Sequence, residues 1–494
     1  MRHVVDDGRA VAPRSLAGRD GTGLLAELAE GSVSAEELLE EHVRLLTGPG
    51  SALGAVVDAD VPAARRAAAE VDRRRARGEQ LPALAGLPVT IKDSFDAAGL
   101  RTSHGRLSDA RPATVDAPLV RRVRAAGAVV LGKTSVPVYL DDHQASTELG
   151  TARNPHDLDR TPGGSSSGAG AAVAAGLSVA DFGSDLAGSL RVPSAWCGLF
   201  GHRPSNGIVS KLGHMPWPQG GLLEPAVSSV GPMVRSARDL ELFLDVLVGV
   251  EGPATRAWRL ELPPPSVDAL DQVRVAVWLD DPAAPVDAET RAALTGFADR
   301  LADAGCRVEE LTDAPVAGQA ALDLFTRLQA GEVVHGLDEA AWQASRELAA
   351  RAGDEPDVLA ARRSVQTLRD ALDDREDQWA TVTRWDRVFD RVDVVLCPAV
   401  PCAAPALSDV PASRRTLELD GRVLPAADTV WAWSRLTGIG MGPATVAPVG
   451  RGARSGLPIG AQLLGRYLDD RTPLRVAALL EEAGVLRFEP PAGW

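Results

Sequence analysis

The sequence predicts an α/β fold in which helices cover a β-sheet in layers. Amphipathic stretches with the 3.6-residue period of helices alternate along the chain with short apolar segments that are typical of strands. Hydrophobic residues make up 45% and charged residues 24% of the chain, which is enough for a substantial core. Because we find no linker long or polar enough to divide the chain, we expect a single domain over residues 1–494.

The first part of the chain, residues 1–80, is expected to be mainly helical. Residues 34–46 carry an amphipathic pattern, and Ser34 followed by Glu37 makes a capping box that marks the start of a helix. Residues 66–78 predict a second helix. We interpret both helices as peripheral packing.

The next stretch alternates between strand and helix. Residues 84–94 contain a short strand that delivers Lys92 at its end, and strand ends are rigid places for a reactive side chain. Residues 115–134 predict a helix, which Gly127 terminates, and then a strand. The apolar stretch 169–182 is interrupted by glycines and a serine, so it predicts a buried helix and not a membrane span.

Helix and strand continue to alternate in the second half. Residues 273–279 predict a strand, 287–304 a helix and 306–311 another strand. Between about 315 and 392 the chain is charged and amphipathic, without glycine loops, which predicts helices that cap the sheet. This order of elements favours a layered α/β protein over a repeat protein.

Charge and composition argue against several function classes. A net charge of −15 disfavours binding to nucleic acids and to anionic membranes, so small neutral or cationic substrates fit better. The N-terminal residues lack the apolar stretch of a secretory signal, and no 18-residue apolar run is present, so we expect a cytoplasmic protein. The cysteines show no zinc-binding spacing and are expected to be small buried residues; they are Cys197, Cys306, Cys397 and Cys402.

Lysine is rare in this chain. Of the 52 basic residues only three are lysines, namely Lys92, Lys133 and Lys211. Arginine can supply charge almost anywhere, but its pKa above about 12 prevents it from acting as a base. A lysine that persists in such a composition therefore marks a position where arginine cannot serve. For Lys133 we favour a structural hydrogen-bonding role.

Two glycine loops each carry a serine and flank one short apolar segment. Ser165 lies in GGSSSG at 163–168, and Ser189 lies in DLAGSLR at 185–191. Glycine lets backbone N–H groups approach a ligand closely and adopt positive φ. Acyl transfer needs this combination, because the nucleophile must lie beside N–H groups placed where oxyanion charge develops.

The stretch 161–205, together with GLPVTIKDSFDAAGLRTSHG at 86–105, resembles the amidase signature family. The resemblance extends through further segments, which are AGAVVLGKTSVP at 126–137, LGTARNP at 149–155, SSVGPMVRSARDLELFLDVL at 228–247, DVVLCPAVPCAAP at 393–405 and LTGIGMGPATVAPVGRGARSGLPIGAQLLGR at 436–466. In that family a serine–serine–lysine triad cleaves amides. By position, the resemblance implies that Ser189 is the nucleophile, that Ser165, preceded by a cis peptide, is the bridging serine, and that Lys92 is the base.

The positions of the histidines also favour a lysine as the base. None of His104, His143 and His202 lies in a matching motif. A lysine can replace histidine where burial disfavours its charged form and lowers its pKa toward neutrality. Ser165 would then relay the proton between Lys92 and Ser189.

The resemblance also implies a layered α/β/α fold with a central mixed β-sheet, and neither a metal nor an organic cofactor. The oxyanion hole would be formed by the backbone N–H groups of Leu186, Ala187, Gly188 and Ser189. Ala187 departs from the family, in which glycine is commoner, but alanine is tolerated when φ stays negative. In this family the region 315–392 varies and helps to shape the substrate pocket.

Other interpretations of the loops stay open. Ser189 could be a helix N-cap or turn serine. The loop 164–168 also satisfies G-x-S-x-G, the nucleophile elbow of α/β-hydrolases, with Ser166 as nucleophile. That motif needs a preceding strand, whereas here a polar, proline-containing segment precedes it. A phosphate-binding loop is disfavoured because the G-K-[ST] ending is missing.

The surroundings of the loops offer further candidates. Arg191 could bind a substrate carboxylate, although we favour its pairing with Asp185 to brace the loop. Trp217, Trp431 and Trp433 are candidates for pocket walls, and equally for ordinary core tryptophans.

The expected function is hydrolysis of a carboxamide in a small molecule through an acyl-enzyme on Ser189. A glutaminase-like subunit of a tRNA-dependent amidotransferase is the alternative from another functional class, and a biosynthetic or non-catalytic relative is a third. We expect no nucleic-acid partner and no membrane association, and a homodimer is compatible with the sequence.

Overall fold

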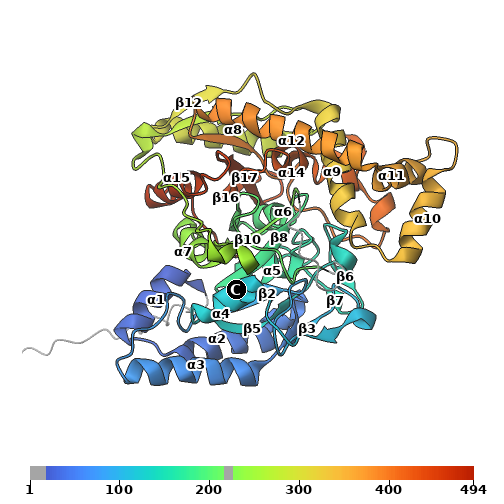
Figure 1. The fold of residues 1–494 in the computed structure, drawn as a ribbon. Helices are drawn as coiled ribbons and strands as arrows, with labels where there is room; N and C mark the ends of the chain where they lie inside the picture. Colours follow the sequence, from blue (N-terminus) through green and yellow to red (C-terminus); the bar gives the residue numbers. More distant parts are fainter. Residues whose placement is uncertain (1–17, 216–225) are drawn as a thin grey trace, which may run out of the picture.

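The computed structural model describes residues 18–215 and 226–494, and Figure 1 shows its architecture. An 11-stranded sheet forms its centre. In spatial order the strands of this sheet are β1 (Val56–Ala59), β5 (Val129–Thr134), β2 (Pro88–Lys92), β8 (Ala180–Asp185), β10 (Ser229–Val234), β9 (Phe200–Arg203), β16 (Ala444–Arg451), β17 (Pro458–Leu464), β13 (Val394–Pro398), β11 (Arg274–Val277) and β12 (Arg307–Glu310). Two-stranded sheets pair β3 (Arg101–Thr102) with β4 (Arg111–Pro112), β6 (Ser146–Thr147) with β7 (Gly150–Thr151), and β14 (Thr416–Leu419) with β15 (Arg422–Pro425).

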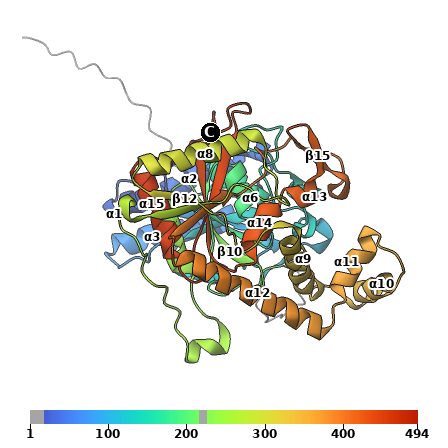
Figure 2. The same cartoon turned by 90° about the horizontal axis from the view of Figure 1, so that it is seen from above.

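The helices come from the whole length of the chain. They are α1 (Gly21–Glu30), α2 (Ala35–Thr47), α3 (Val61–Ala76), α4 (Pro118–Ala125), α5 (Ser167–Ala174), α6 (Arg191–Trp196), α7 (Ala237–Leu247), α8 (Ala288–Asp303), α9 (Gly318–Val334), α10 (Glu339–Ala349), α11 (Pro356–Ser364), α12 (Leu368–Phe389), α13 (Ala426–Thr429), α14 (Ala432–Gly438) and α15 (Arg471–Glu482). In both views α10 and α11 project at one side of the molecule, away from the sheet (Figures 1 and 2).

The sheet is mixed, as predicted. β2 runs parallel to both of its neighbours, β5 and β8. β10 is antiparallel to β8 and to β9. β16, β17 and β13 follow in antiparallel order, and β11 then runs parallel to β13 and to β12. The predicted α/β fold with a central mixed sheet is therefore confirmed.

Helices cover both faces of the sheet, as the alternation along β8 shows. A Cβ placed on Gly183 would lie 2.9 Å from Ser166 Oγ, so Gly183 faces the start of α5. The ring of Phe182 packs instead on Phe243 of α7, with ring centroids 5.6 Å apart. Because successive strand residues point to opposite faces, α5 and α7 cover opposite faces of β8.

Most predicted elements are present. α2 begins with the predicted capping box, in which Ser34 Oγ accepts from the Glu37 N–H and the Glu37 carboxylate accepts from the Ser34 N–H. β2 ends at Lys92, and Gly127 follows α4 with φ +88°. β11, α8 and β12 lie in their predicted ranges, and the charged region between 315 and 392 contains α9 to α12.

The prediction of one buried helix over 169–182 is wrong. α5 ends at Ala174, Gly176 turns the chain with φ +74°, and β8 begins at Ala180. Both elements are fully buried, and an apolar run fits a buried helix and a buried strand equally well. No helix of the described ranges is long and apolar enough to cross a membrane.

Candidate active site

The amine of Lys92 lies among three serine hydroxyls. Lys92 Nζ lies 2.8 Å from Ser165 Oγ, 2.9 Å from Ser166 Oγ and 2.9 Å from Ser184 Oγ. The lysine side chain has no exposed surface. The end of β2 therefore places a fully desolvated amine within hydrogen-bond distance of the first glycine loop.

Burial changes the acid–base behaviour of this amine. It lowers the pKa of Lys92 to about 7, because the ammonium form loses its hydration. The carboxylates of Asp185 and Asp181 oppose this effect, and the charge of Lys211 adds to it. Near pH 7 about half of the amine is therefore neutral, whereas an ordinary lysine would be neutral in only about one molecule in a few thousand.

The glycines before Ser165 allow the first loop to pack closely. A Cβ on Gly164 would lie 2.4 Å from the carbonyl oxygen of Asp142 and 2.8 Å from His143 Cα. Gly163 has φ +90°, and the peptide bond between Gly164 and Ser165 is cis, the geometry that the family resemblance implied. Side chains at these two positions would push the loop away from its neighbours.

Ser189 lies in the second loop, between β8 and α6. Its side chain is largely buried, with 8% of the residue exposed. The Ser166 N–H donates to the carbonyl oxygen of Ser189 at 3.1 Å. This bond joins the two glycine loops, so that the serines predicted from separate motifs lie in one site.

Asp185 and Arg191 brace the second loop. Arg191 Nε and Nη2 donate to the two oxygens of Asp185 at 2.9 and 2.7 Å, and Arg191 Nη1 donates to Thr437 and Gln462. Although burial alone would raise the pKa of Asp185, the Arg191 guanidinium holds it at about 2. The predicted pairing is confirmed, and the guanidinium is directed into the protein.

One of the expected oxyanion donors is wrong. The Gly188 N–H donates to Asp185 Oδ1 at 2.9 Å, so this carboxylate already uses it. The reason is that Asp185 also accepts from the N–H groups of Leu190 and Arg191, and thereby folds the loop around itself. The N–H groups of Leu186, Ala187 and Ser189 stay the predicted donors.

The candidate tryptophans differ in their surroundings. A Cβ on Gly188 would lie 3.3 Å from the ring of Trp431, so this tryptophan lies against the loop that carries Ser189. Trp433 is fully buried, with its ring 4.9 Å from that of Trp278, which matches the alternative interpretation as a core tryptophan. Trp217 lies outside the described residues.

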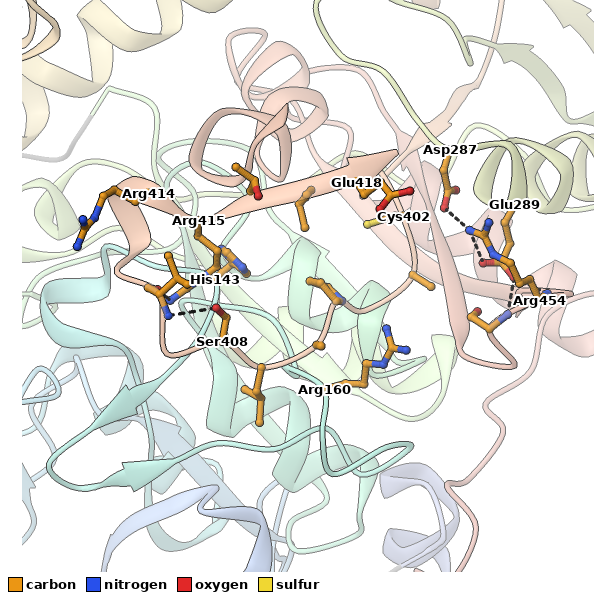
Figure 3. A pocket seen from close by; sticks show the side chains of 18 residues that line it. His143, Arg160, Asp287, Glu289, Cys402, Ser408, Arg414, Arg415, Glu418 and Arg454 are labelled. Atoms are coloured by element: carbon orange, nitrogen blue, oxygen red, sulfur yellow. Dashed lines mark hydrogen bonds and ion pairs between the residues drawn. The ribbon is translucent and has the colours of Figure 1, made fainter. Parts of the chain in front are cut away.

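Figure 3 shows a pocket of about 840 Å³. His143 lines it, with its ring 6.5 Å from that of Trp431. Acidic and basic side chains are paired along its wall, where Arg454 lies 3.5 Å from Asp287 and 3.9 Å from Glu289. Trp431 therefore lies against both the loop that carries Ser189 and His143 of the pocket wall.

Other polar residues have structural surroundings. Lys133 Nζ donates to the carbonyl oxygens of Asp93, Phe95 and Arg101, which confirms its predicted hydrogen-bonding role. The four cysteines are free and buried, as predicted. Within residues 18–215 and 226–494, no group of three His, Cys, Asp or Glu residues could hold a metal ion.

Sequence reasoning missed two neighbours of Lys92. Ser184 contacts the amine from the end of β8, and Asp181 acts on it from the same strand. Both lie within the stretch 161–205 but between its two serine loops, and their only signal was a polar side chain in a buried strand. Their contacts depend on the parallel pairing of β2 with β8.

A family model described as Amidase matches residues 37–474. The chain belongs to the amidase family. This amidase is 35% identical to the putative amidase AmiB2 of Mycobacterium tuberculosis, over 95% of the chain and 97% of that protein. It is 30% identical to the 1-carboxybiuret hydrolase subunit AtzE of Pseudomonas sp. (strain ADP), over 94% of the chain and 99% of that protein.

The fold of this amidase is also found in solved structures. A bacterial aryl acylamidase of the amidase signature family matches it with a TM-score of 0.78 and 26% identity, over 97% of the chain and 99% of that structure. The resemblance that the glycine loops indicated is therefore confirmed. The chain is an amidase, an enzyme that hydrolyses amide C–N bonds.

Proposed function

We propose that this amidase cleaves a linear carboxamide through an acyl-enzyme on Ser189, with Ser165 passing the proton to Lys92. The observation that carries the proposal is the fully buried Lys92 amine, 2.8 Å from Ser165 Oγ and with a pKa lowered to about 7. A neutral amine can accept a proton, and a serine hydroxyl can donate one while it accepts another.

The first half of the reaction forms the acyl-enzyme. Ser189 Oγ attacks the amide carbon, its proton passes to Ser165 Oγ, and the Ser165 proton passes to Lys92 Nζ. The carbonyl oxygen becomes an oxyanion, which the N–H groups of Leu186, Ala187 and Ser189 would stabilise. Each such donor typically contributes about 10²–10³ in rate.

The second half releases both products. The tetrahedral intermediate collapses, the C–N bond breaks, and the leaving amine takes the proton that returns from Lys92 through Ser165. Water then attacks the ester carbon, giving its proton to the same serine–lysine pair, and the C–O bond to Ser189 breaks. The carboxylate leaves, and Ser189 regains its proton.

A covalent label tests the identity of the nucleophile. We expect a phosphonyl or sulfonyl fluoride to add its mass to the peptide that contains Ser189, and Ser189→Ala to stay folded without measurable turnover. Ser166→Ala is the matched control, because Ser166 also contacts Lys92 but would be neither nucleophile nor relay; we expect it to lose less activity than Ser165→Ala. A label on Ser166 would instead favour the nucleophile-elbow interpretation.

The substrate class needs a separate measurement. Aryl, aliphatic and dicarboxylic linear amides, with a cyclic amide for contrast, should be compared by kcat/KM on the purified chain. We expect turnover of linear amides, and the net charge of −15 favours neutral or cationic ones. Turnover of the cyclic amide alone would contradict the proposed class.

A further inference from the structure

Asp181 places a second buried carboxyl on β8, the strand whose Ser184 hydroxyl contacts the amine of Lys92. Asp181, Gly183 and Asp185 alternate along the strand and therefore point to one face. Gly183 faces Ser166, itself a partner of Lys92. The two carboxyls thus lie on either side of the glycine that leaves room for the lysine and the first serine loop.

The two carboxylate oxygens of Asp181 differ in their hydrogen-bond partners. Its Oδ2 accepts from Thr90 Oγ1 at 2.6 Å and from Thr134 Oγ1 at 3.0 Å. Its Oδ1 has no hydrogen-bond partner among the described residues, although the side chain has no exposed surface. Thr90 is the direct strand partner of Asp181 and lies two residues before Lys92 on the same face of β2. A buried, half-satisfied carboxyl is costly, and its persistence in a core needs a reason.

The two carboxyls are not equivalent. Asp185 is bound by Arg191 through two bonds, and Arg203 Nε lies 3.7 Å from it. Its charge is therefore already balanced by arginine. The cation that acts on Asp181 is Lys92, while burial raises the pKa of Asp181 to about 6. Both carboxylates act on Lys92, but Asp181 is the one that no arginine of the described residues binds.

The reaction creates an ammonium in this dry site each time Lys92 takes a proton. We propose that Asp181 is a positioning residue for the reaction, because its carboxylate balances the charge that Lys92 acquires as Ser189 is activated. This inference rests on the proposed function, since it assumes that Lys92 is the base. In this role Asp181 acts through Lys92 and does not need to contact the substrate.

Other charged groups face Lys92 as well. Lys211, after β9, opposes protonation of Lys92, although Lys211 is itself paired with Glu332 of α9 at 3.1 Å. Burial lowers the pKa of His214 well below its usual value, so this ring is neutral. Asp185 and Asp181 both favour the ammonium, Asp185 more strongly, but the charge of Asp185 is shared with Arg191, whereas Asp181 has no arginine bonded to it in the part of the chain that the structure describes.

The test is the pH dependence of Asp181→Asn, which keeps the shape and removes the charge. Loss of the nearby anion should lower the pKa of Lys92, so the acid limb of kcat/KM should move about one unit to lower pH. The plateau should fall by at most about tenfold, because the ammonium loses its counter-charge. Asp239→Asn is the matched control: Asp239 is also buried and accepts from Thr22 Oγ1, but it lies on α7, and its profile should not move.

The outcomes separate this inference from the proposed function. The rate at which a fluorophosphonate labels Ser189, followed against pH, reports the same ionisation without a substrate. An acid limb in Asp181→Asn that coincides with the wild-type limb overturns the inference while Ser189 labelling still supports the proposed function. Wild-type protein that is not labelled at Ser189 would instead remove the proposed function itself. If Asp181→Asn does not fold, Asp181→Ser decides by the same measurement.

Discussion

At the residue scale, the proposed reaction depends on a neutral amine in contact with a hydroxyl. Composition drew attention to the three lysines of the chain, and the family resemblance then predicted Lys92 as the base. The family resemblance predicted Ser165 and Ser189. Ser184 could not be predicted, since its contact with Lys92 arises only when β2 and β8 pair in one register. Residue types fix the chemistry that is available, whereas strand register decides which groups meet.

Replacement of Lys92 tests the base directly. Lys92→Arg keeps a positive charge that cannot be given up, and Lys92→Ala removes the amine, so both should lose at least about 10²-fold in turnover. In the wild type, protons leave Lys92 as the pH rises through its pKa of about 7, so kcat/KM should rise through this pH and then level off. Circular dichroism of both variants controls for folding. A Lys92→Arg enzyme with near-normal turnover and an unchanged pH profile would exclude the lysine base.

At the element scale, the turn from β8 into α6 is built around one carboxylate. Asp185 ends the strand and accepts backbone N–H groups from the loop that follows. Its pairing with Arg191 could be predicted, because the two charges stand close together in one motif. The use of the Gly188 N–H could not, because it depends on the backbone at Gly188, where φ is +123°. The helix expected over 169–182 proved to be a helix, a turn at Gly176 and a strand. This division could not be predicted either, because an apolar run fits a buried helix and a buried strand equally well.

Arg191→Lys tests how much this turn depends on the guanidinium fork. Lysine cannot donate to both oxygens of Asp185 and also reach Thr437 and Gln462, so a buried carboxylate would lose partners. We expect a loss of about 3 kcal/mol in the free energy of unfolding, measured in urea, and a lower kcat because the nucleophile loop shifts.

Arg274→Lys supplies the control for this substitution. Arg274 makes the same two-bonded contact, with Asp393, but 40% of its side chain is exposed. Asp393 is buried, but Arg274 reaches solvent and the pair lies outside the site, so we expect a smaller loss of stability than in Arg191→Lys and unchanged turnover. Equal losses in the two variants would show that the Arg191 brace has no special role.

At the scale of the whole molecule, distant segments meet at the catalytic end of the sheet. Lys92, Ser165 and Ser189 come from the first half of the chain, whereas the partners of Arg191 come from α14 and β17. Glu332 of α9 reaches Lys211 and Ser228, the latter just before β10. The region 315–392 was predicted to be helical and to help shape the substrate pocket, but its carboxylate contact with Lys211 and Ser228 was not predicted. Such contacts depend on how the whole chain folds.

This organisation leads to a prediction about the isolated chain. The groups that hold the proposed triad, from Asp185 and Arg191 to Gln462, all belong to one chain, so the purified protein should hydrolyse amides without a partner. Gel filtration would give its oligomeric state, with a chain mass of 51.7 kDa for reference, and activity should co-elute with either a monomer or a homodimer. The net charge of −15 also predicts no binding of tRNA at physiological salt. A chain that is inactive alone and gains activity only with a second subunit and tRNA would favour the amidotransferase alternative.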